Sequence, residues 1–480
     1  MGVTLDVPVS VLSGTLRKDS GKNRDTMLLL RLPYPYGKKQ TWLPMDLMKV
    51  SAQLEASGVE TTIVDLNLQK MPSQRELESY TYIGTGIIGA PYIPSSKKLV
   101  SEVFEMTGKP VMIGGQGVEH FKPEEFRTIY GKSGIQIKNK DSLANNVRMP
   151  LPDVYSTTVA PQINLIEAEK IMGYLSHEFS FFVSQGCKYG CDFCAADKGI
   201  PEQFNTTIRE DLEAICQSAS EFWVKNLNMY ITSLDLFQNA GKFKDVLTIF
   251  ADVSREYEIK FTLRGLSRID SFLDALEAEP ELHLLIPKAG LKIVGFGVDG
   301  TTMDIWRSQH KGNKSLSDAN KAFIKCLSLG IQPEALMVMG FHDANARPMD
   351  TRDTLRMNVE FCMEQAESHG VVSRPHVAKI LPGSDTKKIK VWSNPAWDSY
   401  RATLLNNPGL LRNLDVAMQA SEVTHPNQEF RSEVNNAYLE IIRSLTPRNL
   451  CGTNPLIPYT GNKDNDMMAD TFNMLVPFDK

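Results

Sequence analysis

The order of apolar and polar positions predicts two parallel β-sheets, one after the other along the chain. In the first part, short apolar runs have the length of buried strands, and residues at helical spacing separate them. The runs cover residues 27–32, 61–65, 82–86 and 110–115, and apolar positions of two helices follow Leu47 and Leu99 and stop at Gly58 and Gly108. This alternation predicts a doubly wound, Rossmann-like parallel α/β sheet over residues 25–145, after a polar extension at 1–24.

A second alternating series predicts a partial (β/α)6 barrel over residues 176–385. Its six apolar runs begin at Phe181 and continue at 228–233, 260–264, 292–299, 335–340 and 375–381. Thr207 and Glu210 have the spacing of a capping box, which predicts the start of the helix after the first strand. The stretch 146–175 is rich in proline and reads as a connector, and 386–480 is mostly helical or irregular. In such sheets, ligands bind at the carboxyl ends of the strands.

Composition narrows the choice of compartment and partner. The chain has 480 residues and a net charge of -5, with acids and bases mixed, so no basic surface indicates a nucleic-acid partner. No apolar run reaches the roughly 18 residues that span a bilayer, and the first residues lack the pattern of a signal peptide. Seven cysteines are too few for a disulfide scaffold. We therefore expect a cytoplasmic protein with no membrane partner.

Three cysteines stand close together, at positions 187, 191 and 194, in a glycine-containing loop after the first strand of the second series. Three thiolates can hold three irons of a [4Fe-4S] cluster, which leaves one iron open to another ligand. A zinc site completed by a further residue is the alternative. Of the other four, Cys216, Cys326 and Cys362 fall in helical patterns and are expected to be small buried side chains, whereas the loop-like setting of Cys451 favours no role.

These features carry a resemblance to a known family. Cys187, Cys191 and Cys194, with Phe193 before the last, match the signature of radical S-adenosylmethionine (SAM) enzymes, and the six-strand series resembles their partial barrel. The preceding sheet, with Gly114 and Gly115, resembles the cobalamin-binding domain of the cobalamin-dependent branch, which includes the class B radical SAM methyltransferases. The resemblance covers about residues 25 to 385.

For SAM, the resemblance implies a set of contacts along the strand ends. The backbone near Phe193 would contact the adenine. The family's usual Gly-Gly-Glu is absent, so Ser233 and Asp235 are the candidates for the methionine amino group. Arg264, expected to end the third strand, would pair with the carboxylate, and Asp299, expected to end the fourth, would hold the ribose. The alternatives are solvated loop charges for Arg264 and Asp299 and a helix N-cap for Asp235.

For cobalamin, the resemblance implies contacts at the ends of the first sheet's strands. The Asp-x-His-x-x-Gly loop of other cobalamin proteins is absent, so the cobalt would have no protein histidine below it. Pro35, Tyr36 and Gly86 would line the lower face, and Gly114 and Gly115 would contact the ligand. The alternatives are a plain glycine turn and a sheet that binds no corrin.

The implied activity is methylation of an unactivated carbon of a small metabolite, in a biosynthetic reaction. The implied cofactors are a [4Fe-4S] cluster, SAM and cobalamin, and a ferredoxin or flavodoxin type of protein would deliver single electrons. The same architecture also supports rearrangement, dehydration, epimerisation or cyclisation, with or without cobalamin. The alternative that is not an enzyme is a binding module stabilised by zinc.

Overall fold

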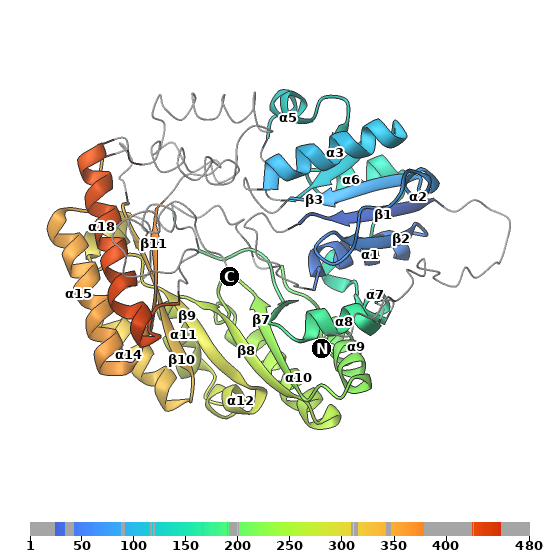
Figure 1. Ribbon diagram of the computed structural model, residues 1–480. Helices are drawn as coiled ribbons and strands as arrows, with labels where there is room; N and C mark the ends of the chain where they lie inside the picture. The colour runs from blue at the N-terminus through green and yellow to red at the C-terminus, as the bar shows by residue number, and fades with distance from the viewer. Residues whose placement is uncertain are drawn as a thin grey trace, which may run out of the picture.

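The computed structural model describes two parallel sheets, each flanked by helices (Figure 1). In Figure 1 the first sheet, in blue, lies beside the green start of the second, and α15 and α18 lie at the far end of the second sheet. Residues 1–24 lie outside the described part. The structure describes residues 25–33, 43–87, 92–115, 118, 121–164, 166, 168–189, 191, 199, 201–308, 311, 315–341, 347–378, 425 and 427–452.

The first sheet has the strand order β2-β1-β3-β4-β5, all parallel. Alternate residues of β1 enter two cores, with Leu28 and Leu30 on one face and Met27 and Leu29 on the other, so both faces are covered. The predicted doubly wound sheet is thus confirmed. Its elements are β1 (Thr26–Arg31), α1 (Met45–Ala56), β2 (Glu60–Asp65), α2 (Gln74–Ser79), β3 (Tyr82–Gly86), α3 (Ile93–Thr107), β4 (Val111–Gly114), α5 (Pro123–Tyr130), β5 (Gly134–Gln136) and α6 (Lys140–Val147).

A connector leads into the second sheet, whose order is β11-β10-β9-β8-β7-β6. All neighbouring strands are parallel, and the predicted six-stranded partial barrel is confirmed. The connector contains η2 (Val154–Ser156), α7 (Ala160–Asn164) and α8 (Ala168–Leu175). The barrel and the chain after it contain β6 (Phe179–Phe182), α9 (Asn205–Glu221), β7 (Asn226–Thr232), α10 (Ala240–Tyr257), β8 (Lys260–Ser267), α11 (Ile269–Ala278), α12 (Leu282–Ala289), β9 (Leu291–Gly297), α13 (Met303–Ser308), α14 (Leu316–Ser328), β10 (Gln332–Met339), α15 (Arg352–His369), β11 (Val372–Val377), α18 (Gln428–Leu445) and η4 (Thr446–Arg448).

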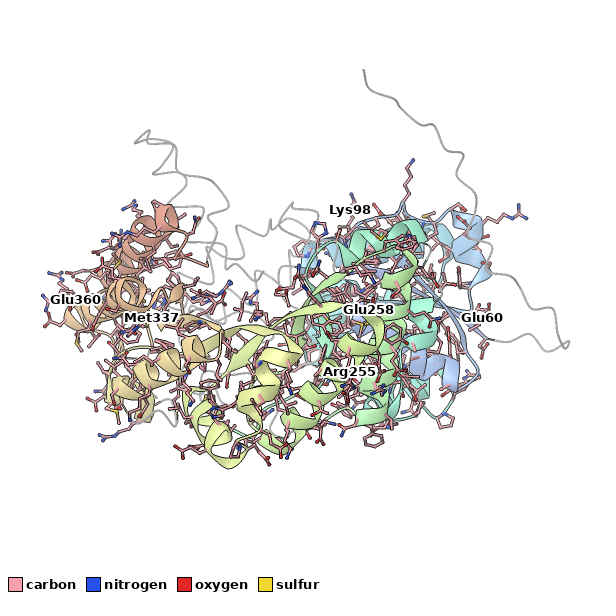
Figure 2. All side chains as sticks on the ribbon, turned by 90° about the horizontal axis from the view of Figure 1, so that it is seen from below. Glu60, Lys98, Arg255, Glu258, Met337 and Glu360 are labelled. Atoms are coloured by element: carbon pink, nitrogen blue, oxygen red, sulfur yellow. The ribbon has the colours of Figure 1, made fainter. Side chains whose placement is uncertain are left out.

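Aromatic rings fill the layer between the strands and the helices of the barrel. Phe250 of α10 meets Phe181 and Phe261 edge to face, with ring centroids 5.4 Å and 5.2 Å apart. Such tilted contacts suit the charge distribution of aromatic rings. Polar side chains lie on the outside of this layer, among them Arg255 and Glu258 at the end of α10 and Glu360 of α15 (Figure 2). The barrel strands are thereby held from one side, which leaves their carboxyl ends to carry loops.

The structure corrects the placement of two predicted site residues at strand ends and of one helix start. β8 continues to Ser267, so Arg264 does not end it, and β9 ends at Gly297, two residues before Asp299. A bulge between Leu263 and Arg264 accompanies the extra length of β8. The helix α9 begins at Asn205 after Phe204, with no side-chain cap, so the predicted capping box at Thr207 is wrong. Thr207 is instead buried within the helix.

The far edge of the barrel is covered by the end of the described chain. The helix α18 packs on α15 and β11, and its buried face includes Val434, Ile441 and Ile442. Beyond it, Ser373 of β11 exchanges backbone hydrogen bonds with Leu450 and Gly452, both of 2.8 Å. Covering an edge strand in this way satisfies its backbone groups.

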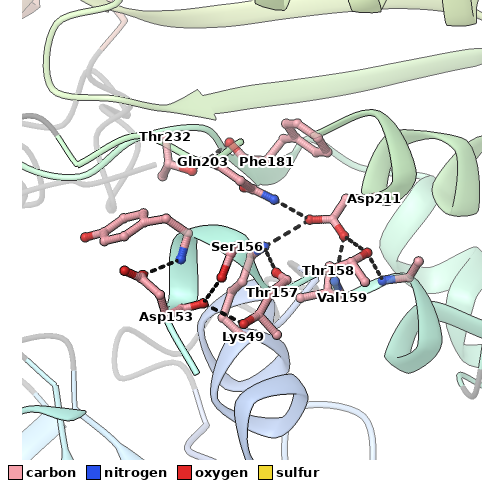
Figure 3. Close-up of polar contacts among 12 residues, drawn as sticks. Lys49, Asp153, Ser156, Thr157, Thr158, Val159, Phe181, Gln203, Asp211 and Thr232 are labelled. Atoms are coloured by element: carbon pink, nitrogen blue, oxygen red, sulfur yellow. Dashed lines mark hydrogen bonds and ion pairs between the residues drawn. The ribbon is translucent and has the colours of Figure 1, made fainter. Parts of the chain in front are cut away.

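A buried carboxylate joins the two halves of the molecule (Figure 3). Asp211 of α9 is fully buried and accepts hydrogen bonds from Lys49 Nζ at 3.0 Å and Gln203 Nε2 at 2.7 Å. Its other oxygen accepts from Thr158 Oγ1 at 2.7 Å and from the backbone N–H of Val159 at 2.6 Å. Burial lowers the pKa of Lys49, and the nearby carboxylate opposes this shift. Helix, connector and barrel are therefore fixed together at one point.

The isolated cysteines behave as expected. Cys216, Cys326 and Cys362 lie in α9, α14 and α15 and are fully buried, and burial raises the pKa of each thiol, to about 12 for Cys216 and Cys362. Cys451 is buried beside β11. None of the helices in the described ranges is both long and apolar enough to cross a bilayer.

Candidate functional site

The cysteine loop leaves the carboxyl end of β6 and is closed at its base. Ser184 and Glu202 form an antiparallel bridge, and the N–H of Gln203 donates to the carbonyl of Val183 at 2.9 Å. Between them lie Cys187 and Cys191, both partly exposed. Cys194 and Phe193 lie outside the described residues. Within those residues, no three metal-ligating side chains stand together, since the third cysteine of the motif is not among them.

The loop between the two cysteines is held by two residues from elsewhere in the barrel, Gln238 and Ser271. The N–H of Lys188 donates to Gln238 Oε1 at 3.1 Å, and its ammonium donates to the carbonyl of Gln238 at 2.8 Å. The hydroxyl of Tyr189 lies 2.8 Å from Ser271 Oγ of α11. The loop therefore has a defined position over the ends of β7 and β8.

Arg268, the first residue after β8, makes a direct contact with a motif cysteine. Its Nη1 donates to Cys191 Sγ at 3.3 Å, and its guanidinium carbon lies 3.8 Å from the centre of the Tyr189 ring. Nε and Nη2 both donate to Asp270, each at 2.9 Å. The apolar pattern does not predict this residue, because the predicted strand ends at Arg264. The signal was present: Ser267 and Arg268 are the first polar pair after the apolar run of β8.

Asp235 lies beneath the loop, three residues after β7, and is 1 % exposed. Its Oδ1 accepts from Ser267 Oγ at 2.9 Å and from the N–H of Arg268 at 3.3 Å. Its Oδ2 is buried and has no hydrogen-bond partner in the described part of the chain. Burial raises the pKa of Asp235, and the nearby side chains of Ser271 and Ser267 oppose the shift. The N-cap alternative is wrong, because Asn239 caps α10.

Ser233 ties the ends of β6 and β7 together. Ser184 Oγ donates to Ser233 Oγ at 2.9 Å, and both serines are buried. Ser233 and Asp235 border one small cavity together with Glu202, Gln238 and Lys242. Of the five predicted SAM-contact residues, these two lie together beside the cysteine loop.

Arg264 lies deeper, inside the barrel. Its guanidinium pairs with Glu178 at 3.3 Å and with Glu334 at 3.5 Å, and it lies over the ring of Tyr230. Glu334 also pairs with Arg374 through two hydrogen bonds of 2.5 Å and 2.7 Å. The reading as a solvated loop charge is wrong, because Arg264 is buried. Its pairing with the SAM carboxylate stays a prediction.

Asp299 follows β9 in a strained turn. Its φ is 51° and that of Gly300 is 92°, and a non-glycine residue with positive φ is uncommon. The carboxylate is buried and pairs with Lys311, so it is no solvated loop charge either. Positive φ at a strand end is often retained where a side chain must face a ligand. Its contact with ribose stays a prediction.

At the first sheet, Pro35 and Tyr36 lie outside the described residues. Gly86 ends β3, where an added Cβ would come no closer than 3.6 Å to Leu47. Gly115 has a φ of 97°, and an added Cβ would lie 2.5 Å from the carbonyl oxygen of Ile87. The turn itself therefore requires glycine at position 115, with or without a ligand. At Gly114, an added Cβ would meet Ile137 at ordinary contact distance. Contacts of the three glycines with cobalamin stay predictions.

The fold matches solved structures, although no protein-family model and no curated protein sequence matches the chain. The radical SAM methyltransferase TsrM from Kitasatospora setae, solved with tryptophan and a SAM analogue, aligns at 14 % identity with a TM-score of 0.56, over 75 % of this chain and 74 % of its own. The cobalamin-dependent SAM radical enzyme OxsB, solved with aqua-cobalamin and SAM, aligns at 14 % identity and a TM-score of 0.56, over 94 % of this chain and 64 % of its own. The chain therefore has the fold of cobalamin-dependent radical SAM enzymes.

Proposed function

We propose that this chain is a radical SAM enzyme that binds a [4Fe-4S] cluster through Cys187, Cys191 and Cys194. The observation that carries the proposal is the cysteine loop. Two of the three thiols lie in a loop at the carboxyl end of β6, and one accepts a hydrogen bond from a buried guanidinium. Anionic sulfur ligands of a cluster accept such donors, which suits this site to thiolates. The likeness in fold to TsrM and OxsB supports the same conclusion.

Bound together, the cluster and SAM would supply the one-electron chemistry that protein side chains lack. The chain's own residues would hold SAM in place. Asp235 Oδ2 is a buried acceptor without a partner in the described chain, beside the loop, and suits the methionine ammonium. Ser233 borders the same cavity. Phe193 would contact adenine, Arg264 the carboxylate and Asp299 the ribose.

We further propose that the first sheet binds cobalamin and that the reaction is methylation of a carbon in a small molecule. Gly86 keeps the end of β3 free of a side chain, which suits the approach of a flat corrin ring. Gly114 and Gly115 would contact the same ligand, and Pro35 and Tyr36 would lie below it. The relatives in fold support the choice: the TsrM structure is described as a methyltransferase with cobalamin and a [4Fe-4S] cluster. A ferredoxin or flavodoxin type of donor would supply electrons in the cytoplasm.

Anaerobic reconstitution with iron, sulfide and cobalamin tests the binding proposals. We expect about four irons per chain in the wild type. C191S should lose most of the iron, whereas C326S, which changes a buried cysteine of α14, should keep it. Zinc uptake in place of iron, or equal iron in both variants, would contradict the cluster.

The reaction is tested by product analysis with SAM and a strong reductant. S-adenosylhomocysteine formed together with 5'-deoxyadenosine indicates methyl transfer by a radical route. 5'-deoxyadenosine alone, with no corrin bound, would replace the methylation proposal by rearrangement, dehydration, epimerisation or cyclisation on the same barrel. Neither product from an iron-loaded chain would contradict the radical proposal as a whole.

A further inference from the structure

We propose that Arg268 is a positioning residue that fixes the cysteine loop and raises the reduction potential of the cluster. This inference rests on the proposed function, because it concerns the cluster held by Cys191. Arg268 makes three contacts at once: a hydrogen bond to Cys191 Sγ at 3.3 Å, a stack on Tyr189 at 3.8 Å, and a two-fold hydrogen bond to Asp270. A planar guanidinium can make all three, and an ammonium cannot.

The position of the charge determines the sign of the effect. Arg268 is 7 % exposed, so little water screens its interaction with the sulfur of Cys191. A reduced cluster carries one more negative charge than an oxidised one. A cation that donates a hydrogen bond to a ligand sulfur therefore stabilises the reduced form and raises the potential. Asp270 sits on the opposite side of the guanidinium and offsets part of this effect.

The same residue links the cluster loop to the proposed SAM pocket. The backbone N–H of Arg268 donates to Asp235 Oδ1, and its side chain stacks on Tyr189, whose hydroxyl contacts Ser271. One short segment, 267–271, thus sets the position of the loop and of the buried carboxylate. Movement of Arg268 is expected to disturb both.

The test is a redox titration of the reconstituted full-length chain, followed by electron paramagnetic resonance of the reduced cluster. R268Q removes the positive charge. R268K keeps the charge but loses the two-fold hydrogen bond to Asp270 and the stack on Tyr189. D270N keeps the guanidinium and removes its counter-charge. R255Q is the control: Arg255 also pairs with an aspartate three positions away, but it is 76 % exposed on the outer surface of the barrel (Figure 2).

We expect the midpoint potential to become more negative in R268Q, to shift less in R268K, and to become less negative in D270N, with R255Q unchanged. Opposite shifts in R268Q and D270N are the signature, because general loosening of the loop would not give shifts of opposite sign. If R268Q takes up no iron, the midpoint potential of D270N alone tests the role of Arg268, and an unchanged potential would contradict it. Wild-type potentials in the iron-loaded variants overturn the role of Arg268 and leave the cluster proposal intact. A wild type without iron overturns the cluster proposal itself.

Discussion

The carboxyl edges of the two sheets are built differently. At the first sheet, Arg31 and Asp65 pair at 2.9 Å and Tyr174 of the connector donates to the same carboxylate at 2.9 Å, while β3 and β4 end in glycine. At the barrel, Arg268, Asp235 and Asp299 are buried polar residues around a cysteine loop. The first edge therefore presents backbone where β3 and β4 end, whereas the barrel edge presents buried polar side chains.

Hydrogen bonding shows the same contrast. Among the described residues between 25 and 147, each buried side-chain nitrogen and oxygen has a partner, whereas Asp235 Oδ2 and Gln238 Nε2 at the barrel edge have none in the described chain. Buried polar atoms are almost always paired, so unpaired ones point to a missing ligand or water. The two unpaired atoms at the barrel edge suit the polar ligand that we propose for it. The first edge, by contrast, suits a ligand that is recognised by shape and backbone contacts.

The largest expected effect comes from the buried ion pair between Lys49 and Asp211, which links the two halves of the molecule. K49M removes the cation beside Asp211 and leaves a fully buried carboxylate with neutral donors only. Breaking a buried pair in this way costs about 3–5 kcal/mol. We expect a loss of that size in urea unfolding, with faster hydrogen exchange in both β1 and β7. K98M, at an exposed pair on α3, is the control and should stay within about 0.5 kcal/mol of wild type. Exchange that rises in β1 alone would show that the halves fold independently.

A pair of glycine substitutions sharpens the contrast by destabilising one half at a time. In G115A the new Cβ meets the carbonyl of Ile87 in the first sheet, and in G290A it meets that of Phe261 in the barrel, both at positive φ. Strain and overlap together should cost about 2–4 kcal/mol in each case. G108A has positive φ but open space and should cost about 1 kcal/mol. Hydrogen exchange should rise around β4 in G115A and around β8 and β9 in G290A. Equal costs for G115A and G108A would rule out the close approach.

The sequence alone predicted both sheets, because short apolar runs of β-strand length alternate with segments whose apolar residues have helical spacing. It missed β5, whose three residues Gly134–Gln136 are too short to give a periodic signal. It misplaced Arg264 because β8 continues past the predicted apolar run to Ser267, and it therefore missed Arg268. The spacing of the three cysteines was enough to predict a cluster site. The partners of Asp235 and Cys191 were not, because they come from a different strand end that only tertiary packing brings near.

The smallest expected effect concerns the buried carboxylate of the barrel edge. Burial raises the pKa of Asp235 in the folded protein above the ordinary value of about 3.9, so the folded state holds the proton more tightly than the unfolded state. Its contribution to stability is then complete below the unfolded pKa and is lost as pH rises through the folded pKa. D235N cannot ionise, so wild type should lose stability relative to D235N as pH rises above the unfolded pKa of about 3.9.

Urea unfolding of both proteins across this pH range measures the difference. S267A removes a hydrogen bond that lowers the pKa of Asp235, so it should steepen the loss of stability at rising pH. D235N and S267A thus move the pH dependence in opposite directions, while the first sheet, followed by hydrogen exchange in β1, should not respond. A flat difference between wild type and D235N would mean that the carboxylate is no harder to ionise in the folded barrel than in the unfolded chain. The contrast between the two edges would then rest on geometry alone.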